Sequence, residues 1–401
     1  MNMVQNPFRP GAGHMPPHLA GRKSEEQEFV SLLEQDIILK NMVLTGLRGV
    51  GKTVLLETFK PKAIAAGWLW AGTDLSESCS ISEDHMATRL VTDLSVVTSS
   101  ISAGEGPRIG FGVGEPLTLD FPTLKKIYDQ TPGLASDKLR GVLEAVWPYV
   151  ETRGKGIIFA YDEAQNLDDQ AAKDQFPLSL LLDTFQSLQR KGIRFMLALT
   201  GLPTLFPKLV EARTYTERMF HVISLGPLTK PQTVAAIQVP STKADSPVHF
   251  GDAATDVIWN ITRGYPYFIQ YVCREVFDVW VQAVQTGSQP QAVPTAPIMR
   301  KLDSDFFAGR WSRATDRQRE LLGVIAALPH SDAEFTVQEI VEGNANRALA
   351  KPFGSSHVSQ MLVVLASAGL VYKNRHGKYS FAVPLMGDFV KRQQEISEPW
   401  A

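Results

Sequence analysis

The sequence predicts an α/β protein in which a parallel sheet lies between two layers of helices. Five short apolar runs, each typical of a buried strand, alternate with longer amphipathic segments that are typical of helices. Alternation of this kind implies parallel strands that are joined by helical crossovers. The chain has 401 residues, of which 44% are hydrophobic, so we expect a globular protein of two or three domains.

The predicted strands all lie in the first 228 residues. They are 41–45, 67–72, 156–164, 194–203 and 220–228. Before them, residues 1–17 are rich in Pro and Gly and are expected to lie extended over the surface, and a helix with Ser24 as its N-cap follows. A long insertion separates the second and third strands, and its glycine-rich part, 100–120, predicts either a β-hairpin or a mobile surface loop.

The C-terminal part of the chain has a different pattern, because the strand-like runs stop after Pro227. A small helical bundle is expected first, and a stretch rich in Pro, Gly and Ser then reads as a linker. Further helices and a β-hairpin follow in the order of a winged helix-turn-helix. The predicted organisation is an N-terminal extension at 1–40, an α/β core at 41–226, a helical bundle at 227–288, a linker at 289–300 and a winged-helix domain at 301–401.

Bulk composition limits the possible partners and the compartment. A formal net charge of -2 gives no whole-chain attraction to nucleic acid or membrane, so any such contact must come from a local patch. The two cysteines, Cys79 and Cys273, lie far apart without neighbouring ligands, which argues against a disulfide framework or a zinc site and favours a reducing compartment. No apolar run suits a signal peptide or a membrane helix, so we expect a cytoplasmic protein.

The segment Gly46–Thr53, GLRGVGKT, fits the pattern G-x-x-x-x-G-K-[ST] between a predicted strand and a predicted helix. Backbone N–H groups must approach phosphate oxygens closely there, so glycine is needed, and the helix N-terminus adds a positive dipole end. Lys52 would reach the β- and γ-phosphates, and the Thr53 hydroxyl would bind Mg²⁺. The predicted nucleotide-binding residues here are Gly46, Arg48, Gly49, Val50, Gly51, Lys52, Thr53 and Val54.

Two acidic residues at the end of the third predicted strand complete the expected site. Asp162 is placed to meet the Mg²⁺ shell, and Glu163 is placed to orient and deprotonate the attacking water. Thr200 ends the fourth strand, where its hydroxyl either touches the γ-phosphate or the water, or simply closes the strand. Arg213 and Arg218 precede the last strand. Arg218 is either an arginine finger for a neighbouring subunit or a partner in a surface salt bridge.

These motifs resemble, in their order, the AAA+ and STAND group of P-loop ATPases, and within it the bacterial and archaeal ATPases related to origin-recognition initiators. The resemblance covers nearly the whole chain. Its motifs are LAGRKSE, GLRGVGKT, YDEAQ, LTGLP, ERMF, GPL and GYP, followed by a winged helix. It implies a P-loop NTPase core with parallel strands in the order 5-1-4-3-2, a helical lid, and Mg·ATP bound between them.

The resemblance also implies roles for residues outside the glycine loop. Arg22 and its surroundings would lie near the adenine, and Tyr265 and Pro266 of the lid would contact the nucleotide as in the STAND branch. The initiator branch carries a lid arginine three residues after the glycine, where this chain has Tyr267. Two nearby arginines, Arg263 and Arg274, are the candidates to replace it.

The winged helix predicts weakly specific DNA contact, with docking of a partner as the alternative. Its expected recognition helix, within 353–369, contains no Lys or Arg. Basic residues lie instead on the wing and the tail, which suits contact with the DNA backbone. They are Lys373, Arg375, Lys378, Lys391 and Arg392, with His376 at the tip of the wing. The predicted nucleic-acid contacts are Lys373, Arg375 and Lys378.

Three functions are therefore open. The first is a slow ATPase that acts as a molecular switch and controls a DNA-binding winged helix. The second is a signalling or defence regulator in which ATP controls assembly, either of a homo-oligomer or with a protein partner. The third is a nucleotide-binding scaffold with negligible turnover. GTP is disfavoured as the nucleotide because the chain has no Asn-Lys-x-Asp guanine reader.

Overall fold

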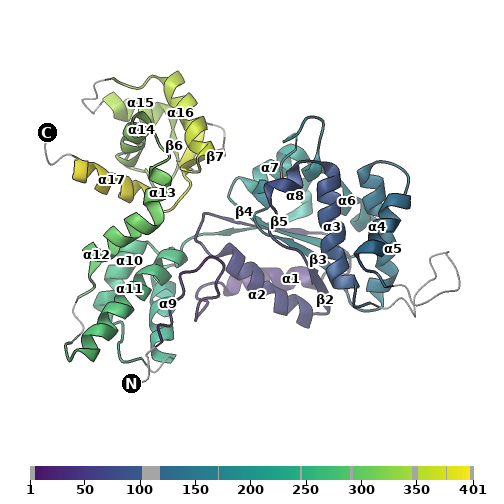
Figure 1. Cartoon of the computed structure of the whole chain (residues 1–401), viewed down its shortest axis with the longest axis horizontal. Coiled ribbons are helices and arrows are strands. Elements are labelled where there is room, and N and C mark those ends of the chain that lie inside the picture. Colours follow the sequence, from purple (N-terminus) through teal and green to yellow (C-terminus); the bar gives the residue numbers. More distant parts are fainter. Residues whose placement is uncertain are drawn as a thin grey trace. The chain divides into compact units, whose positions relative to one another are not determined.

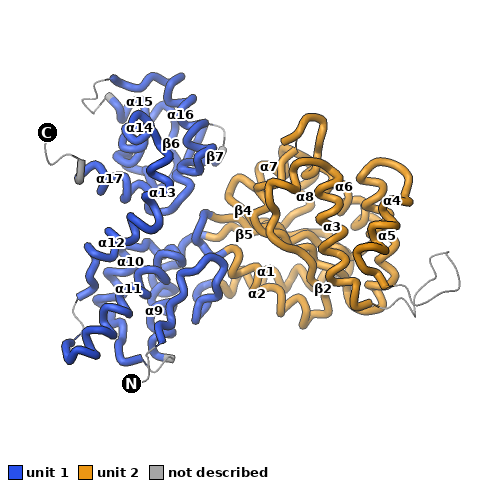
Figure 2. Tube along the Cα trace, viewed as in Figure 1, with its two compact units in different colours: residues 1–21, 47–51, 226–401 blue, residues 22–46, 52–225 orange. Residues whose placement is uncertain are grey.

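The computed structural model describes residues 5–101, 118–169, 171–243, 246–289, 292–345, 351–375 and 377–397. Its contacts divide the chain into two compact units (Figure 2). Unit 2 comprises residues 22–46 and 52–225, and unit 1 comprises residues 1–21, 47–51 and 226–401. Most of the glycine-rich insertion, 102–117, lies outside the described residues, so the choice between a hairpin and a loop stays a prediction.

Unit 2 contains a five-stranded sheet whose strands are all parallel and follow the order β2-β3-β4-β1-β5. The strands are β1 (Asn41–Gly46), β2 (Trp68–Ala71), β3 (Gly156–Tyr161), β4 (Phe195–Gly201) and β5 (Phe220–Leu225). Every residue of β1, β3 and β4 is buried, because these central strands are covered on both faces. The strand order 5-1-4-3-2 that the resemblance implies is therefore confirmed.

Helices cover both faces of this sheet (Figure 1). The helices of unit 2 are α1 (Lys23–Leu33), α2 (Lys52–Ala65), α3 (Glu83–Thr98), α4 (Phe121–Gln130), α5 (Ala135–Glu151), α6 (Pro177–Arg190), α7 (Leu205–Ala212) and α8 (Thr216–Met219). On one face α1 and α2 pack together, and the Phe29 and Phe59 rings stack with centroids 4.2 Å apart. The helices α3 to α7 share one apolar core with the sheet on the other face. The three-layer α/β/α fold is confirmed.

Unit 1 contains a helical lid and a winged helix that share one apolar core. The lid consists of α9 (Lys230–Lys243), α10 (Asp252–Thr262) and α11 (Pro266–Gln285). A continuous helical run follows, made of α12 (Thr295–Leu302), the π-helical turn η4 (Asp303–Phe307) and α13 (Ala308–Trp311). The composition predicted an open linker at 289–300, but the second half of this segment is helical. The physical reason is that the apolar side chain of Ile298 is buried in the core of unit 1.

The C-terminal elements have winged-helix topology. The helices α14 (Asp316–Ala326), α15 (Val337–Ala345) and α16 (Ser355–Ser367) precede the hairpin of β7 (Val371–Arg375) and β8 (Lys378–Phe381). The short strand β6 (Phe335–Thr336) pairs with β8 and completes an antiparallel sheet of order β6-β8-β7. Helix α17 (Met386–Ser397) follows the wing and packs on α14.

Two expectations for the N-terminal region are wrong. The segment before Pro17 does not simply lie over the surface, because the Phe8 side chain is 0% exposed and contacts the rings of Phe250 and Phe277 in the lid core. Ser24 is not the N-cap of the first helix. That helix begins at Lys23, and the Ser24 hydroxyl donates to Glu25 instead.

None of the described helices has the length and apolar character needed to cross a membrane. Both cysteines are buried and have free thiols.

Candidate active site

The glycine loop connects β1 to α2 and adopts the backbone conformation for which its glycines were predicted. Gly49 has φ +80° and Gly51 has φ +92°, which is a region that residues with a Cβ rarely adopt. Val50 between them is fully buried and anchors the loop. No described residue accepts a hydrogen bond from the N–H groups of Gly49 or Gly51. These groups suit an anion that lies over the loop.

Helix α2 begins at the two residues that carry the predicted phosphate and metal chemistry. The Lys52 side chain is 8% exposed, and its Nζ atom donates to the Gly46 carbonyl oxygen at 3.0 Å. The ammonium group thus folds back along the loop. The Thr53 hydroxyl donates to Oδ2 of Asp162, the residue that directly follows β3.

Asp162 is the centre of the polar contacts at the ends of the strands. Its side chain is 4% exposed, and its second oxygen, Oδ1, accepts from the Thr200 hydroxyl and from the Glu163 N–H at 2.7 Å. Thr53, Asp162 and Thr200 follow or end β1, β3 and β4, which are neighbours in the sheet. The carboxyl ends of neighbouring parallel strands meet at one edge, which is where ligands of open α/β sheets bind.

Glu163 is held in a defined position beside Asp162. Its backbone is left-handed, with φ +52°, which turns the chain sharply after β3. The Gln165 amide donates to the Glu163 carboxylate, and the amide oxygen of Gln165 accepts from the Leu202 N–H at 3.1 Å. Gln165 therefore ties Glu163 to the turn after β4. In the sequence, Gln165 is visible only as the last residue of the YDEAQ motif, and no local pattern indicates this role.

Asp74 is a further acidic residue at this edge that the sequence did not reveal. It forms a parallel bridge with Asp162, and the neighbouring Leu75 N–H donates to the Asp162 carbonyl at 2.9 Å. Burial, and then the charges of Asp162 and Glu163, raise the pKa of Asp74 above its ordinary value. Several carboxylates thus share a small region, where a cation would relieve their repulsion.

The predicted Mg²⁺ fits this arrangement only as an ion that shares protein, phosphate and water ligands. The described part of the chain has no group of three or more His, Cys, Asp or Glu side chains that could hold a metal. Mg²⁺ characteristically keeps several waters and takes one or two protein ligands plus substrate phosphates. The Thr53 hydroxyl and the Asp162 carboxylate, already in contact, suit that role.

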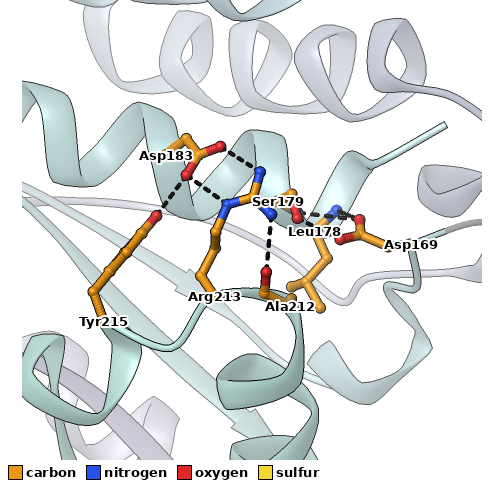
Figure 3. Close-up of polar contacts among 7 residues, drawn as sticks. All are labelled: Asp169, Leu178, Ser179, Asp183, Ala212, Arg213 and Tyr215. Carbon is orange, nitrogen blue, oxygen red and sulfur yellow. Dashed lines mark hydrogen bonds and ion pairs between the residues drawn. The ribbon is translucent and has the colours of Figure 1, made fainter.

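Arg213 does not lie free to reach a neighbouring subunit. Its guanidinium donates twice to the carboxylate of Asp183 on α6, at 2.9 and 2.7 Å, and the Tyr215 hydroxyl donates to the same carboxylate (Figure 3). Burial tends to raise the pKa of Asp183, but the bonds from Arg213 and Tyr215 outweigh it and lower the pKa overall. Arg218 on α8 is exposed, and no ion-pair partner for it occurs among the described residues. Its role as a finger stays a prediction.

Arg22 lies immediately before α1 and is almost fully buried. The side chain pairs with Glu25 at 3.2 Å, and burial lowers the pKa of the arginine. Arg22 and Glu25 both belong to the LAGRKSE motif. No contact described here bears on adenine, so this role also stays a prediction.

The lid residues meet the glycine loop within unit 1, to which loop residues 47–51 belong. Tyr265 is the N-cap of α11 and Pro266 its first residue. Tyr267 follows, and its N–H donates to the Gly49 carbonyl oxygen at 3.0 Å. A Cβ on Gly49 would lie 3.0 Å from the Tyr267 Cβ, so glycine is also needed there for close packing.

The two arginines that could have replaced a lid arginine are engaged elsewhere. Arg263, with φ +49° at the end of α10, pairs with Asp332 and Asp388 of the winged helix. Arg274 donates to the Phe8 carbonyl oxygen at 3.1 Å. Each guanidinium binds a segment distant in sequence that local patterns could not show, and a role toward nucleotide stays a prediction for both.

The wing residues lie as the winged-helix topology requires. Lys373 on β7 is exposed and Lys378 on β8 is half-buried, whereas only the backbone of Arg375 is described and His376 lies outside the described residues. Arg392 is not available to DNA, since it makes two bonds to the carboxylate of Asp303.

The comparisons with known proteins agree with this fold. A domain of unknown function (DUF8462) matches residues 304–390, which span the winged helix. A search of curated proteins gives no match to the chain. Among solved structures, a Walker-type ATPase of Pyrococcus abyssi superposes with a TM-score of 0.54 at 16% identity, over 93% of this chain and 96% of that one.

A second similar structure is the ORC2 protein of Aeropyrum pernix, solved in ADPNP–ADP complexes. It has a TM-score of 0.51 at 14% identity and covers 97% of this chain and 98% of that one. Its ADP form gives a TM-score of 0.52 at 14% identity, over 96% and 97% of the two chains. At such low identities the likeness is one of fold. Over nearly its whole length, the chain has the fold of the P-loop ATPases related to the origin-recognition proteins.

Proposed function

We propose that the chain binds Mg·ATP on residues 46–54 and hydrolyses it slowly, and that the bound nucleotide sets the state of the winged helix. The observation that carries this proposal is the meeting of Thr53 and Thr200 on the two oxygens of buried Asp162. A Gly-rich strand-to-helix turn without catalytic purpose does not need a buried carboxylate that contacts both the start of α2 and the end of β4. The same-fold ORC2 protein was solved with ADPNP and ADP, which supports a nucleotide for this chain too.

Each residue of the site has a step that its position allows. The N–H groups of Gly49 and Gly51 cradle phosphate oxygens, and Lys52 moves from the Gly46 carbonyl to the β- and γ-phosphates. Mg²⁺ would neutralise charge that develops on the phosphates, held by Thr53 and Asp162. Glu163, fixed by Gln165, accepts the proton of the attacking water. Thr200 keeps Asp162 oriented, and this interpretation favours a positioning role over direct contact with substrate.

For the output, we propose that the wing contacts the DNA backbone. Lys373 is exposed on the wing, and Arg375 and Lys378 follow in the same hairpin. If these three residues each neutralise one phosphate, log K against log salt should have a slope of about -2.7, since each contributes roughly -0.9. The pairing of Arg392 with Asp303 removes the tail arginine from this count.

One observation favours a protein partner instead. On α16 the exposed residues carry no charge, and Val363 and Val364 are 66% and 50% exposed. Such a surface lacks the cations that DNA requires and suits contact with another protein. Under this alternative ATP controls assembly, and the wing lysines are merely solvated.

Two measurements separate these outcomes. Steady-state phosphate release tests the ATPase: the wild type should turn over ATP with Mg²⁺, and Lys52→Ala should not. Binding of a labelled duplex at low salt, with and without Mg·ATP, tests the output. Salt-sensitive binding that nucleotide alters, and that Lys373→Glu weakens, supports DNA. No duplex binding, together with a nucleotide-dependent oligomer that Val363→Asp disrupts, supports the protein partner.

A further inference from the structure

Arg310 lies on α13, directly after the π-helical turn that leads into the winged helix. Its guanidinium carbon is 4.8 Å from the centre of the Phe306 ring, and its Nη1 atom donates to the Phe306 carbonyl oxygen at 2.8 Å. A cation over an aromatic face with one backbone acceptor is held in position but keeps most of its donors for another group.

Three successive contacts join this arginine to the tip of the glycine loop. Arg310 covers Phe306, and the Phe306 ring lies 5.0 Å from the Tyr267 ring. Tyr267 in turn donates its N–H to the Gly49 carbonyl oxygen at 3.0 Å. All of these residues belong to unit 1, as does the loop tip, so the contacts lie within one compact body.

The charges around Arg310 are of its own sign. Burial, and then the neighbouring Arg48 and Arg313, lower its pKa. Arg48 is part of the glycine loop, and Arg313 is exposed just after α13. In the described part of the chain none of these three arginines pairs with a carboxylate. Two arginines a few residues further on do so: Arg317 pairs with Glu320 and Arg319 with Asp316.

Arg48 of the glycine loop and Arg313 both act on Arg310 with a charge of the same sign, which is unfavourable unless an anion joins them. We propose that Arg310, together with Arg48 and Arg313, binds the phosphate chain of the nucleotide on the glycine loop. The ligand class is a polyphosphate, and the inference rests on the proposed ATP site. Arg310 is then the residue through which the helical run 295–311 senses whether the loop carries a nucleotide.

The position of Arg310 gives this binding a structural consequence. Helix α13, which carries Arg310, follows η4 directly. Phe307 of that turn stacks on Phe389 of α17, with centroids 5.0 Å apart and an interplanar angle of 16°. A π-helical turn is often found at functional sites because its extra residue can shift. Pulling Arg310 toward phosphate would therefore act on the turn that packs against the last helix of the winged helix.

The test compares nucleotide affinity in arginine variants of the full chain by calorimetry, with thermal unfolding as a check on folding. Arg310→Gln should weaken Mg·ATP binding roughly ten- to hundred-fold, the range expected for the loss of a charge-assisted hydrogen bond. Arg310→Lys should recover part of that loss because it keeps the charge. Arg319→Gln, which removes an arginine already paired with Asp316, should bind like the wild type.

Two further arms keep the test decisive if Arg310→Gln folds poorly. Arg313→Gln changes an exposed residue and should weaken Mg·ATP binding several-fold without changing the melting temperature. Inorganic tripolyphosphate should bind the wild type more tightly than Arg310→Gln, which tests the cluster without any nucleoside. Equal loss of affinity in Arg310→Lys and Arg310→Gln with a lowered melting temperature would assign Arg310 a packing role and overturn the proposal.

The failures of the two ideas can be told apart. If the wild type binds Mg·ATP and both Arg310→Gln and Arg313→Gln bind it equally well, the arginine site is wrong and the ATP site stands. If the folded wild type does not bind Mg·ATP, the proposed function fails, and the tripolyphosphate comparison alone decides whether the cluster binds anions.

Discussion

Replacing Glu163 by Gln isolates the proposed proton acceptor from every structural role of that position. Gln has the same length, tolerates the left-handed φ of +52° no worse than Glu, and still offers an oxygen to the Gln165 amide. Loss of a general base costs a factor of about 10²–10⁴, which is roughly 3–5 kcal/mol of activation free energy. Stability should rise slightly, because one of the charges that raise the pKa of Asp74 is removed.

Single-turnover hydrolysis of ATP by excess protein is the assay, with ATP affinity measured in parallel. Glu163→Gln should bind ATP at least as tightly as the wild type and release phosphate at least a hundred times more slowly. Glu57→Gln is the matched control, since Glu57 also acts on Asp74 but lies on the exposed side of α2. If Glu163→Gln hydrolyses ATP at the wild-type rate, the assignment of Glu163 as the base is wrong. If Glu57→Gln is slowed as much as Glu163→Gln, the loss of rate comes from the removed charge alone.

Three further substitutions test the surroundings of the site. Thr200→Val removes one hydrogen-bond donor from Asp162. It should lower the free energy of unfolding by about 1–2 kcal/mol in urea titrations and slow ATP hydrolysis about tenfold. An unchanged rate would mean that Thr200 only ends its strand. Asp183→Asn removes the ion pair with Arg213 and should lower the free energy of unfolding. Because the pKa of Asp183 is lowered in the folded protein, this loss should have its full size above pH 3.8 and shrink as the pH falls below that value. A loss that stays constant down to pH 2 would contradict this. Asp74→Asn should have the opposite effect on stability, because the raised pKa of Asp74 in the folded protein means that its ionised carboxylate is destabilising. The melting temperature should therefore rise at pH 7 and stay unchanged at pH 3. A drop at pH 7 would mean that the carboxylate is needed for the fold.

The parts of the fold that the sequence predicted are those that local patterns determine. The central strands are buried on both faces, so each appears in the sequence as an unbroken apolar run such as 156–161. The glycine loop is recognisable because eight consecutive residues contain both the glycines that its backbone requires and the Lys and Thr of its chemistry. The positive φ values of Gly49 and Gly51 match that requirement. Asp162 and Glu163 could be placed because they directly follow a strand of this kind.

The parts that were missed depend on contacts between distant residues. Phe8 looked like a residue of a surface segment, yet it fills the lid core more than 200 residues away in sequence. Asp74 follows a short edge strand, and only the sheet order places it beside Asp162. Arg263 has no local signal because it pairs with the winged helix, and Arg310 has none because its link to the nucleotide site runs through Arg48, which is distant in sequence.

The claim on which the function depends is that the loop from Gly46 to Thr53 holds a triphosphate beside Asp162. Calorimetric titration of Mg·ATP into the wild type and Lys52→Ala, with circular dichroism to show that both are folded, tests it most directly. The wild type should bind and the variant should bind at least a hundredfold more weakly, because the Lys52 ammonium would contact two phosphates. Equal affinity in the two proteins, or no heat of binding from the folded wild type, would contradict the claim.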